Sequence, residues 1–279
     1  MNGKRVIITG ASRGIGKEAA YALARQGAEL TLVVRDKALG DTVADECKRK
    51  GAASVDVLTC DLSSQKDIRR LGKEILERYE RISVLINNAG AIYTERQTTV
   101  DGLERTFATN HVAYFLLTTL LLDRLKASAP ARIVNVASDA HRRNSFDLND
   151  LQSERSFSGM SVYGASKLMN ILFTRELHKR LQGSDVTVNA LHPGVVATNF
   201  GDSATGILKS LLKLGRPFMR SEADGAKTTV YLASSAEVSG VSGRYFKNCR
   251  EATPSAQARR DDLAAGLWAA TEKLVQASA

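Results

Sequence analysis

Cysteine and proline are scarce in this sequence, which has three cysteines and four prolines among its 279 residues. The cysteines are odd in number and form no CxxC pair: Cys47, Cys60 and Cys249. The sequence therefore predicts neither a disulfide framework nor a zinc site. We expect a reducing, cytoplasmic compartment.

Long apolar runs are also missing. The longest candidate, YFLLTTLLLDRL, is interrupted by Asp123 and Arg124 and falls short of the roughly 20 apolar residues that a transmembrane helix needs. The first residues, MNGKRVIITG, lead into a strand-like run and a glycine turn where a signal peptide would need an apolar segment. We expect a soluble protein with no transmembrane segment.

Aromatic residues make up only 6% of the chain, and the net charge is +9. The basic residues alternate with acids in runs such as QKDIRRLGKE, and no aromatic residues lie among them to form a stacking platform for single strands. We interpret most of this charge as solvated helix surface and expect no nucleic-acid partner.

Apolar runs rich in β-branched residues alternate with longer amphipathic runs along the whole chain. Six strands are predicted at 5–9, 29–34, 54–59, 81–87, 131–138 and 185–192, with a weaker seventh at 243–247. Helices are predicted at 15–26, 38–50, 65–79, 100–126 and 160–181. Strands that are apolar on both faces and alternate with helices form parallel sheets. The predicted fold is α/β, a Rossmann-type doubly wound, seven-stranded parallel sheet with helices on both faces, in a single domain over 1–279.

The stretch ITGASRGIG follows the first predicted strand and opens the first predicted helix. There a glycine-rich turn can bind the phosphates of a dinucleotide at the helix N-terminus. Gly10 allows a sharp turn, Gly14 a close backbone approach to pyrophosphate, and Gly16 close packing of helix on sheet. The spacing differs from G-x-G-x-x-G, so taken alone it also fits an ordinary tight turn. The same turn contributes the candidate cofactor-binding residues Ser12, Arg13 and Ile15.

TGASRGIG resembles the T-G-x-x-x-G-x-G signature of the short-chain dehydrogenase/reductase superfamily. Further signatures of its classical type follow in order over nearly the whole chain: CDL at 60–62, NNAG at 87–90, Asn110, Ser138, YGASK at 163–167 and HPGVVAT at 192–198. VVRD, NHVAYFLLT, RIVNVAS, ILFTREL and SGRYFKNC are similar to the retinol dehydrogenase-like branch. Many such enzymes carry a membrane-anchoring segment ahead of the first strand, where this sequence differs.

Tyr163 and Lys167 are four residues apart on a predicted helix and so share a face. A nearby ammonium lowers the pKa of a phenol, which predicts Tyr163 as general acid/base. Ser138, at the end of an apolar strand, is placed to hydrogen-bond the same substrate oxygen. The resemblance implies that Lys167 also holds the nicotinamide ribose and that Asn110 positions a water in a proton relay. Singly, each residue also fits a structural role.

Arg13 in the turn and Arg35 after the second strand predict NADP(H), because arginine pairs with a 2′-phosphate. Asp36 leaves NAD(H) as the alternative, or it is the N-cap of the next helix. The resemblance implies further cofactor contacts near the adenine (Asp61, Leu62), the ribose (Asn87, Ala89, Gly90) and the carboxamide (Pro193, Gly194, Val196, Thr198). Asp61 alternatively caps the following helix.

The segment at 199–220 is apolar with interspersed basic residues, and we interpret it as a substrate lid. The candidate pocket residues are Tyr93, His141 and Phe200, although a surface role for His141 fits equally well. Alternatively, 206–214 forms an amphipathic helix that makes peripheral contact with a membrane. Neither the spacing of His111, His178 and His192 nor any other cluster indicates a metal. We expect structural hydrogen bonds for His111 and His192.

The sequence thus predicts an NADP(H)-dependent oxidoreductase that interconverts an alcohol and an aldehyde or ketone on a small hydrophobic substrate of retinoid, steroid or lipid type. The alternative is a dinucleotide-binding redox sensor without turnover. An epimerase or dehydratase fits less well, because those relatives resemble a different glycine spacing. The resemblance also implies a homo-oligomer.

Overall fold

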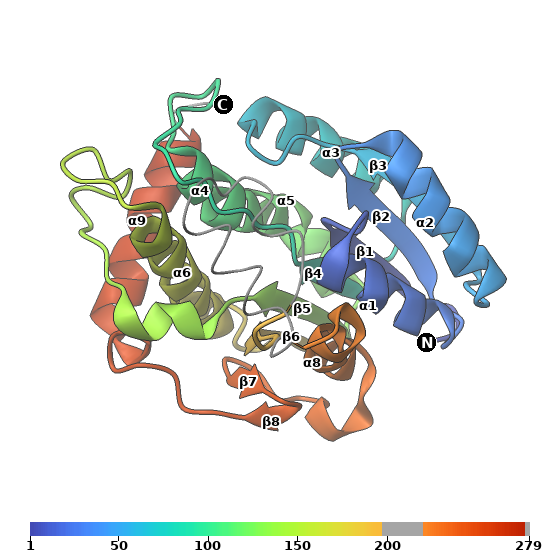
Figure 1. Cartoon of the computed structure of the whole chain (residues 1–279). Helices are drawn as coiled ribbons and strands as arrows, with labels where there is room; N and C mark the ends of the chain where they lie inside the picture. The colour runs from blue at the N-terminus through green and yellow to red at the C-terminus, as the bar shows by residue number, and fades with distance from the viewer. Residues whose placement is uncertain (197–219, 277–279) are drawn as a thin grey trace.

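In a computed structural model that describes residues 1–196 and 220–276, a central sheet is covered by helices on both faces (Figure 1). Its strand order is β3-β2-β1-β4-β5-β6-β7-β8. The strands are β1 Arg5–Thr9, β2 Glu29–Val34, β3 Ser54–Thr59, β4 Val84–Asn87, β5 Ala131–Val136, β6 Val186–His192, β7 Tyr245–Lys247 and β8 Arg250–Glu251. This confirms the doubly wound α/β fold.

The eighth strand corrects the predicted number of seven. β1 to β7 are parallel, whereas β8 pairs antiparallel with β7. The turn between them places Asn248 and Cys249 at φ of 54° and 57°. β8 is only two residues long and exposed, so it has no apolar alternation by which sequence could reveal it.

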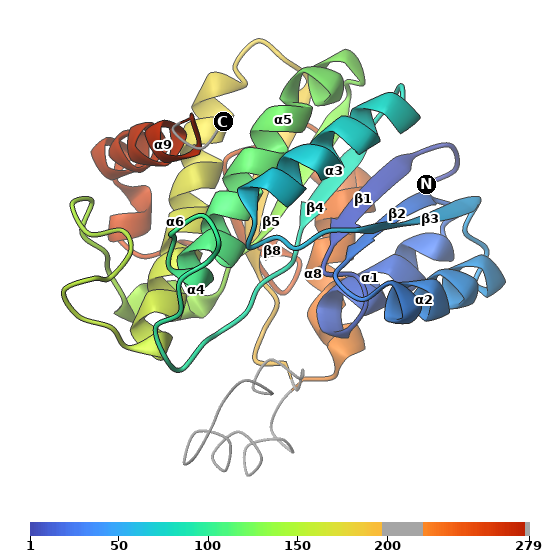
Figure 2. The same cartoon turned by 90° about the horizontal axis from the view of Figure 1, so that it is seen from above.

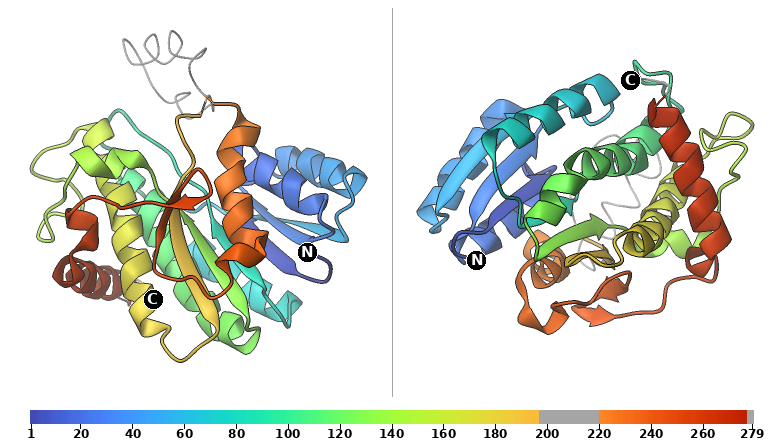
Figure 3. Two further views of the ribbon diagram at one scale, coloured as in Figure 1. Left: turned by 90° about the horizontal axis from the view of Figure 1, so that it is seen from below. Right: turned by 180° about the vertical axis from the view of Figure 1, so that it is seen from behind.

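The helices divide into two layers (Figures 2 and 3). One layer contains α1 Gly14–Ala24, α2 Lys37–Arg49 and α8 Glu222–Ser234. The other contains α3 Gln65–Arg78, α5 Ala113–Ala127 and α6 Gly159–Arg180, with α9 Asp261–Gln276 packed on α6. The ranges predicted from sequence did not include α8 and α9. No helix in the two described stretches is long and apolar enough to span a bilayer.

The helix predicted over 100–126 begins later and is not regular. The short helix α4, Arg105–Phe107, begins after Glu104, whose buried carboxylate accepts hydrogen bonds from the N–H groups of Thr106 and Phe107. A π-helical turn over Ala108–Val112 then joins α4 to α5. The carboxylate cap stops the helix from extending back to Val100, which is exposed in the preceding turn.

β1 lies between β2 and β4, at the point where the connections from the strands change sides of the sheet. The carboxyl ends of parallel strands in such a fold open a crevice at this switch point, and ligands bind there. The glycine turn follows the carboxyl end of β1. Ser138, and after it α6, follow the carboxyl end of β5. The candidate site residues therefore lie along this carboxyl edge of the sheet.

Candidate active site

The glycine turn between β1 and α1 is shaped to bring backbone close to a ligand. Gly10 has φ of +67°, a conformation that favours glycine. A Cβ on Gly16 would lie 2.4 Å from the Gly10 carbonyl oxygen and 2.5 Å from Asn88 Nδ2. Arg13 precedes α1 in an extended conformation, and its side chain makes no cap to the helix N-terminus. The first N–H groups of α1, including Gly14, Ile15 and Gly16, thus fit a phosphate group.

The end of β2 separates the roles of Arg35 and Asp36. Asp36 Oδ1 accepts a hydrogen bond of 3.2 Å from Leu39 N and caps α2, as the N-cap interpretation predicted. Arg35 is exposed directly after β2. Asp36 is therefore engaged with the helix, and Arg35 is the side chain at this strand end suited to a 2′-phosphate.

The N-cap interpretation of Asp61 is wrong. The cap of α3 is Ser64, whose side chain accepts from Asp67 N. Asp61 Oδ1 instead accepts from Ser63 N at 3.0 Å and from Ser63 Oγ at 2.7 Å, which holds the turn after β3. Leu62 packs partly buried against the core. These contacts leave the adenine role of Asp61 and Leu62 a prediction.

Thr9, for which no role was predicted, and Asn88 of the NNAG motif hold β1 to the end of β4. Thr9 Oγ1 accepts hydrogen bonds from Asn88 N at 2.9 Å and Ala89 N at 3.1 Å. Asn88 Nδ2 donates to Thr9 O at 2.8 Å. Asn87 is buried, and its amide donates to Asn135 Oδ1 at 2.9 Å, which fits a backbone role toward cofactor. Thr9 lies in ITGASRGIG and Asn88 in NNAG. Membership in these two motifs is therefore the sequence feature that could have identified both residues.

The three central catalytic candidates come from two elements. Ser138 follows β5, and Tyr163 and Lys167 lie on α6. The Ser138 hydroxyl hydrogen-bonds with the Tyr163 phenol. The Lys167 Nζ atom is buried, donates to Val136 O at 3.0 Å and lies 5.7 Å from the centroid of the Tyr163 ring. The structure thus brings the predicted residues together.

The pKa values in this cluster differ from the sequence expectation. Burial raises the pKa of Tyr163 to about 12, and the hydrogen bond with Ser138 lowers it only in part. Burial also lowers the pKa of Lys167 to about 7. The predicted lowering of the Tyr163 pKa is wrong for this structure, because desolvation outweighs the stabilisation of the phenolate. A phenol with a raised pKa holds its proton at neutral pH.

Asn110 lies in the π-helical turn, beside the loop that follows β4. Its Oδ1 accepts from Ala91 N at 2.8 Å, and its Nδ2 donates to Ala91 O at 2.9 Å and to Ser166 Oγ at 3.0 Å. A Cβ on Gly90 would lie 3.2 Å from Lys167 Nζ and 3.4 Å from Asn110 Oδ1. Gly90, Asn110 and Lys167 therefore meet, while the bound water remains a prediction.

Two of the predicted substrate-pocket residues, His141 and Tyr93, lie in the described part of the chain. His141 is buried, its Nδ1 lies 2.7 Å from Ser138 O, and its Nε2 accepts from Ser255 N at 3.0 Å. The surface interpretation is therefore wrong, because the backbone groups around the ring hold it inside, while its role toward substrate stays a prediction. The half-buried Tyr93 has the Arg105 guanidinium 4.7 Å from its ring centroid.

The carboxamide-binding candidates follow β6. Pro193, Gly194 and Val196 are partly buried, and Arg220 N donates to Val195 O at 2.8 Å. Thr198, Phe200, most of the predicted lid at 199–220 and the alternative helix at 206–214 lie outside the described residues.

His111 and His192 make the structural hydrogen bonds predicted for them. His111 Nε2 lies 3.1 Å from Thr271 Oγ1 of α9, and burial lowers the His111 pKa to about 4. His192 Nδ1 accepts from Asp139 N at 3.2 Å. Both imidazoles are buried and tie separate elements together.

Comparisons with known proteins agree with this geometry. The short chain dehydrogenase family profile matches residues 4–206. Human retinol dehydrogenase 14 is 41% identical over 99% of this chain and 87% of its own length. The crystal structure of an uncharacterized protein from Mycobacterium paratuberculosis has a TM-score of 0.79 and 33% identity, covering 99% of this chain and 94% of that one. An alcohol dehydrogenase from the archaeon Thermococcus sibiricus, solved with 5-hydroxy-NADP, has a TM-score of 0.64 and 26% identity, covering 81% and 88%.

Proposed function

The chain belongs to the short chain dehydrogenase family, in its retinol dehydrogenase-like branch, and from this premise we propose its specific reaction. It is an NADP(H)-dependent oxidoreductase that interconverts an alcohol with an aldehyde or ketone on a small hydrophobic substrate. The observation that carries the proposal is the meeting of Ser138, Tyr163 and Lys167 at the carboxyl edge of the sheet.

Tyr163 serves as the general acid in the reduction direction. Its raised pKa keeps the phenol protonated at neutral pH, so Tyr163 Oη has a proton to give to the substrate oxygen. The Ser138 hydroxyl donates a hydrogen bond to the same oxygen, where negative charge develops. In oxidation the transfer is reversed: Tyr163 first gives up its proton, and the resulting phenolate removes the hydroxyl proton of the alcohol.

Lys167 supports this proton transfer. Its ammonium lies 5.7 Å from the Tyr163 ring centroid, close enough to stabilise the phenolate left after the proton departs. Gly90 lies beside the same Nζ atom, because a Cβ built on it would lie 3.2 Å from Lys167 Nζ and 3.4 Å from Asn110 Oδ1. When bound, the nicotinamide supplies or accepts the hydride.

The preference for NADP(H) rests on Arg35 and Arg13. Both are exposed near the glycine turn, whereas Asp36 caps α2. Arginine pairs with a 2′-phosphate through charge-assisted hydrogen bonds. The alcohol dehydrogenase from Thermococcus sibiricus binds an NADP derivative, which supports the same choice here.

The substrate class rests on similarity to human retinol dehydrogenase 14. We infer an apolar carbonyl or alcohol of retinoid, steroid or lipid type. A cytoplasmic location and a homo-oligomer belong to the same proposal, the first from the few unpaired cysteines and the second from the family resemblance.

A turnover assay tests the proposal. NADPH or NADH is mixed with the purified chain and a panel of nonanal, all-trans-retinal and an aromatic ketone, and consumption of the reduced cofactor is followed by absorbance. We expect NADPH-dependent reduction of at least one apolar aldehyde. Tight NADPH binding without turnover on any carbonyl would favour the redox-sensor alternative, and a preference for NADH would overturn the cofactor assignment.

A further inference from the structure

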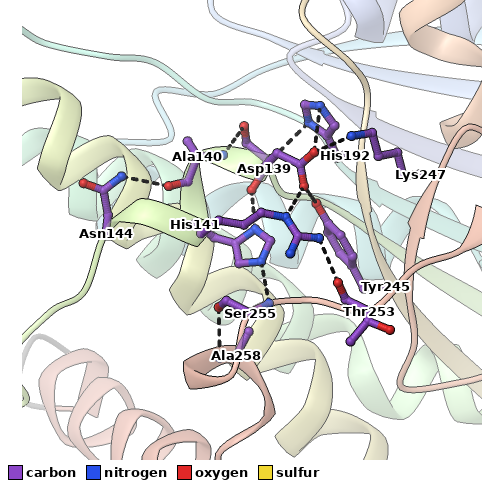
Figure 4. A network of polar contacts seen from close by, with 12 residues as sticks. Asp139, Ala140, His141, Asn144, His192, Tyr245, Lys247, Thr253, Ser255 and Ala258 are labelled. Atoms are coloured by element: carbon purple, nitrogen blue, oxygen red, sulfur yellow. Dashed lines mark hydrogen bonds and ion pairs between the residues drawn. The ribbon is translucent and has the colours of Figure 1, made fainter.

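Asp139 follows Ser138 directly and lies at the centre of a polar network that the proposed reaction does not use (Figure 4). Asp139 and His141 belong to a 3-10 helix over Asp139–Arg143 that begins where β5 has ended. The other partners come from the end of β6, from β7 and from the chain after β8. One short segment next to Ser138 thus contacts three elements distant in sequence.

The Asp139 carboxylate accepts hydrogen bonds from three side chains. Oδ2 accepts from Lys247 Nζ at 2.7 Å, and Oδ1 accepts from Tyr245 Oη and Arg142 Nε at 3.0 Å each. Burial opposes ionisation, but Lys247 and Arg142 outweigh it and hold the Asp139 pKa well below its ordinary range. The carboxylate is therefore ionised, and it is only partly exposed.

The same residue fixes the end of β6. Asp139 N donates to His192 Nδ1 at 3.2 Å, so the ring proton of the neutral imidazole is on Nε2. His192 Nε2 in turn lies 3.7 Å from Asp139 Oδ2. His192 immediately precedes Pro193 and Gly194, the candidate carboxamide-binding residues. Asp139 therefore joins the Ser138 segment to the strand end that borders the predicted nicotinamide site.

Ser138 itself is held from the other side by the 3-10 helix. Its Oγ accepts from Ala140 N at 3.2 Å, and its carbonyl lies 2.7 Å from His141 Nδ1. Because His141 Nε2 accepts from Ser255 N, Nδ1 carries the proton and donates to Ser138 O. A shift of the 3-10 helix would thus move the Ser138 hydroxyl.

We propose that Asp139 is a positioning residue, whose carboxylate sets the distance between the Ser138 hydroxyl and the nicotinamide-binding segment after β6. The inference rests on the proposed function, because it assigns Ser138 a role in the reaction. Asp139 itself does not touch the reacting atoms: its carboxylate is directed to Lys247, Tyr245 and Arg142. Loss of the carboxylate would leave Lys247 and Arg142 without their shared anion and release the Ser138 segment.

Two measurements on Asp139→Asn and Lys247→Met test the proposal, with Asp147→Asn as the control. Asp147 forms an exposed ion pair with Arg155 at 3.0 Å, outside the network. Hydrogen–deuterium exchange of peptides covering 137–143 and 192–196 reports local order without any substrate. Steady-state rates with NADPH and the best aldehyde of the panel report catalysis.

We expect faster exchange in both peptides for Asp139→Asn, with exchange at 10–16 unchanged. We also expect kcat to fall about tenfold or more, while KM for NADPH stays within about twofold, because misplacement of a reacting group reduces the chemical step more than cofactor binding. Lys247→Met removes one partner and gives a smaller loss, and the double variant should lose less than the product of the two. Asp147→Asn should match the parent.

Unchanged exchange in Asp139→Asn would overturn the inference whether or not the chain turns over. Faster exchange with parental kcat would also overturn it, because Ser138 would then be released without a cost to the reaction. A parent that reduces no carbonyl would count against the proposed function alone, and the exchange experiment would still decide whether Asp139 holds the two segments.

Discussion

The ends of β1 and β5 lie on the same edge of one sheet, yet they are built in different ways. At β1 the important feature is the absence of side chains: added Cβ atoms at Gly10 or Gly16 would meet backbone or Asn88 within 3 Å. Beside the end of β5 the important features are polar side chains: Ser138 follows the strand, and Tyr163 and the buried Lys167 lie next to it on α6. The first end should be sensitive to added atoms and the second to removed ones.

Removing the Tyr163 hydroxyl should give the largest effect. Tyr163→Phe keeps the ring but lacks the transferable proton, so kcat should fall about 10²-fold or more. NADPH affinity, measured by fluorescence titration, should change little, because no atom is added near the glycine turn. A variant with near-parental turnover on a confirmed substrate would show that Tyr163 is not the acid.

Adding one methyl group to the glycine turn should weaken cofactor binding, which removal of the Tyr163 hydroxyl leaves unchanged. In Gly16→Ala the new Cβ would lie 2.4 Å from Gly10 O, so the turn must shift and affinity for NADPH and NADH should both fall about tenfold or more. Gly72→Ala is the matched control, since its Cβ would meet only the flexible Leu120 side chain, at 3.0 Å. Equal cofactor affinities in Gly16→Ala and the parent would refute phosphate binding by the glycine turn.

Arg35→Ala should separate the two cofactors. A charge-assisted hydrogen bond to phosphate contributes about 1.5 to 3 kcal/mol, so NADPH should bind about tenfold more weakly. NADH lacks the 2′-phosphate and should keep its affinity. Lys48→Ala, which removes an exposed cation paired with Asp45, is the control. If both cofactors weaken alike, Arg35 acts on the fold of the turn and not on the phosphate.

The smallest expected effect is on stability. Lys167 has an unfolded-state pKa of 10.5 and a folded-state pKa of about 7. Between these values the unfolded chain binds more protons, so this group adds stability as pH rises and is least favourable below about pH 7.

Lys167→Met should therefore raise the melting temperature by about 3 °C or more near neutral pH, even as activity is lost. The gain should shrink toward pH 10. Thermal melts at several pH values check this, and a pH-independent difference between variant and parent would contradict the buried-ammonium explanation.

The same contrast explains what sequence could predict. β1, β2 and β3 have the bounds expected from sequence. For β1 and β2 the reason is that buried parallel strands are continuous apolar runs, whereas β3 is the half-buried edge strand. The candidate catalytic residues were predicted from motif spacing and not from periodicity. Local patterns therefore sufficed for the seven parallel strands, and short motifs for Ser138, Tyr163 and Lys167, whereas the two-residue β8 was missed.

The contacts between distant segments could not be predicted in this way. His141 meets the backbone of Ser255, 114 positions away in sequence, and no local pattern indicates such a pair. The pKa of Tyr163 also depends on burial by the assembled fold, which raises it although the nearby ammonium of Lys167 was expected to lower it.

The π-helical turn at Ala108–Val112 has a consequence for how related chains are aligned. A π-turn contains one residue more than an α-turn, and each helical residue advances the direction of side chains by about 100°. Loss of one residue here would restore a regular helix and rotate all side chains before the turn relative to α5. Phe107 and Leu103 would leave the apolar core that they now occupy. Natural length variation should therefore be absent at this turn and tolerated in the exposed bend around Val100.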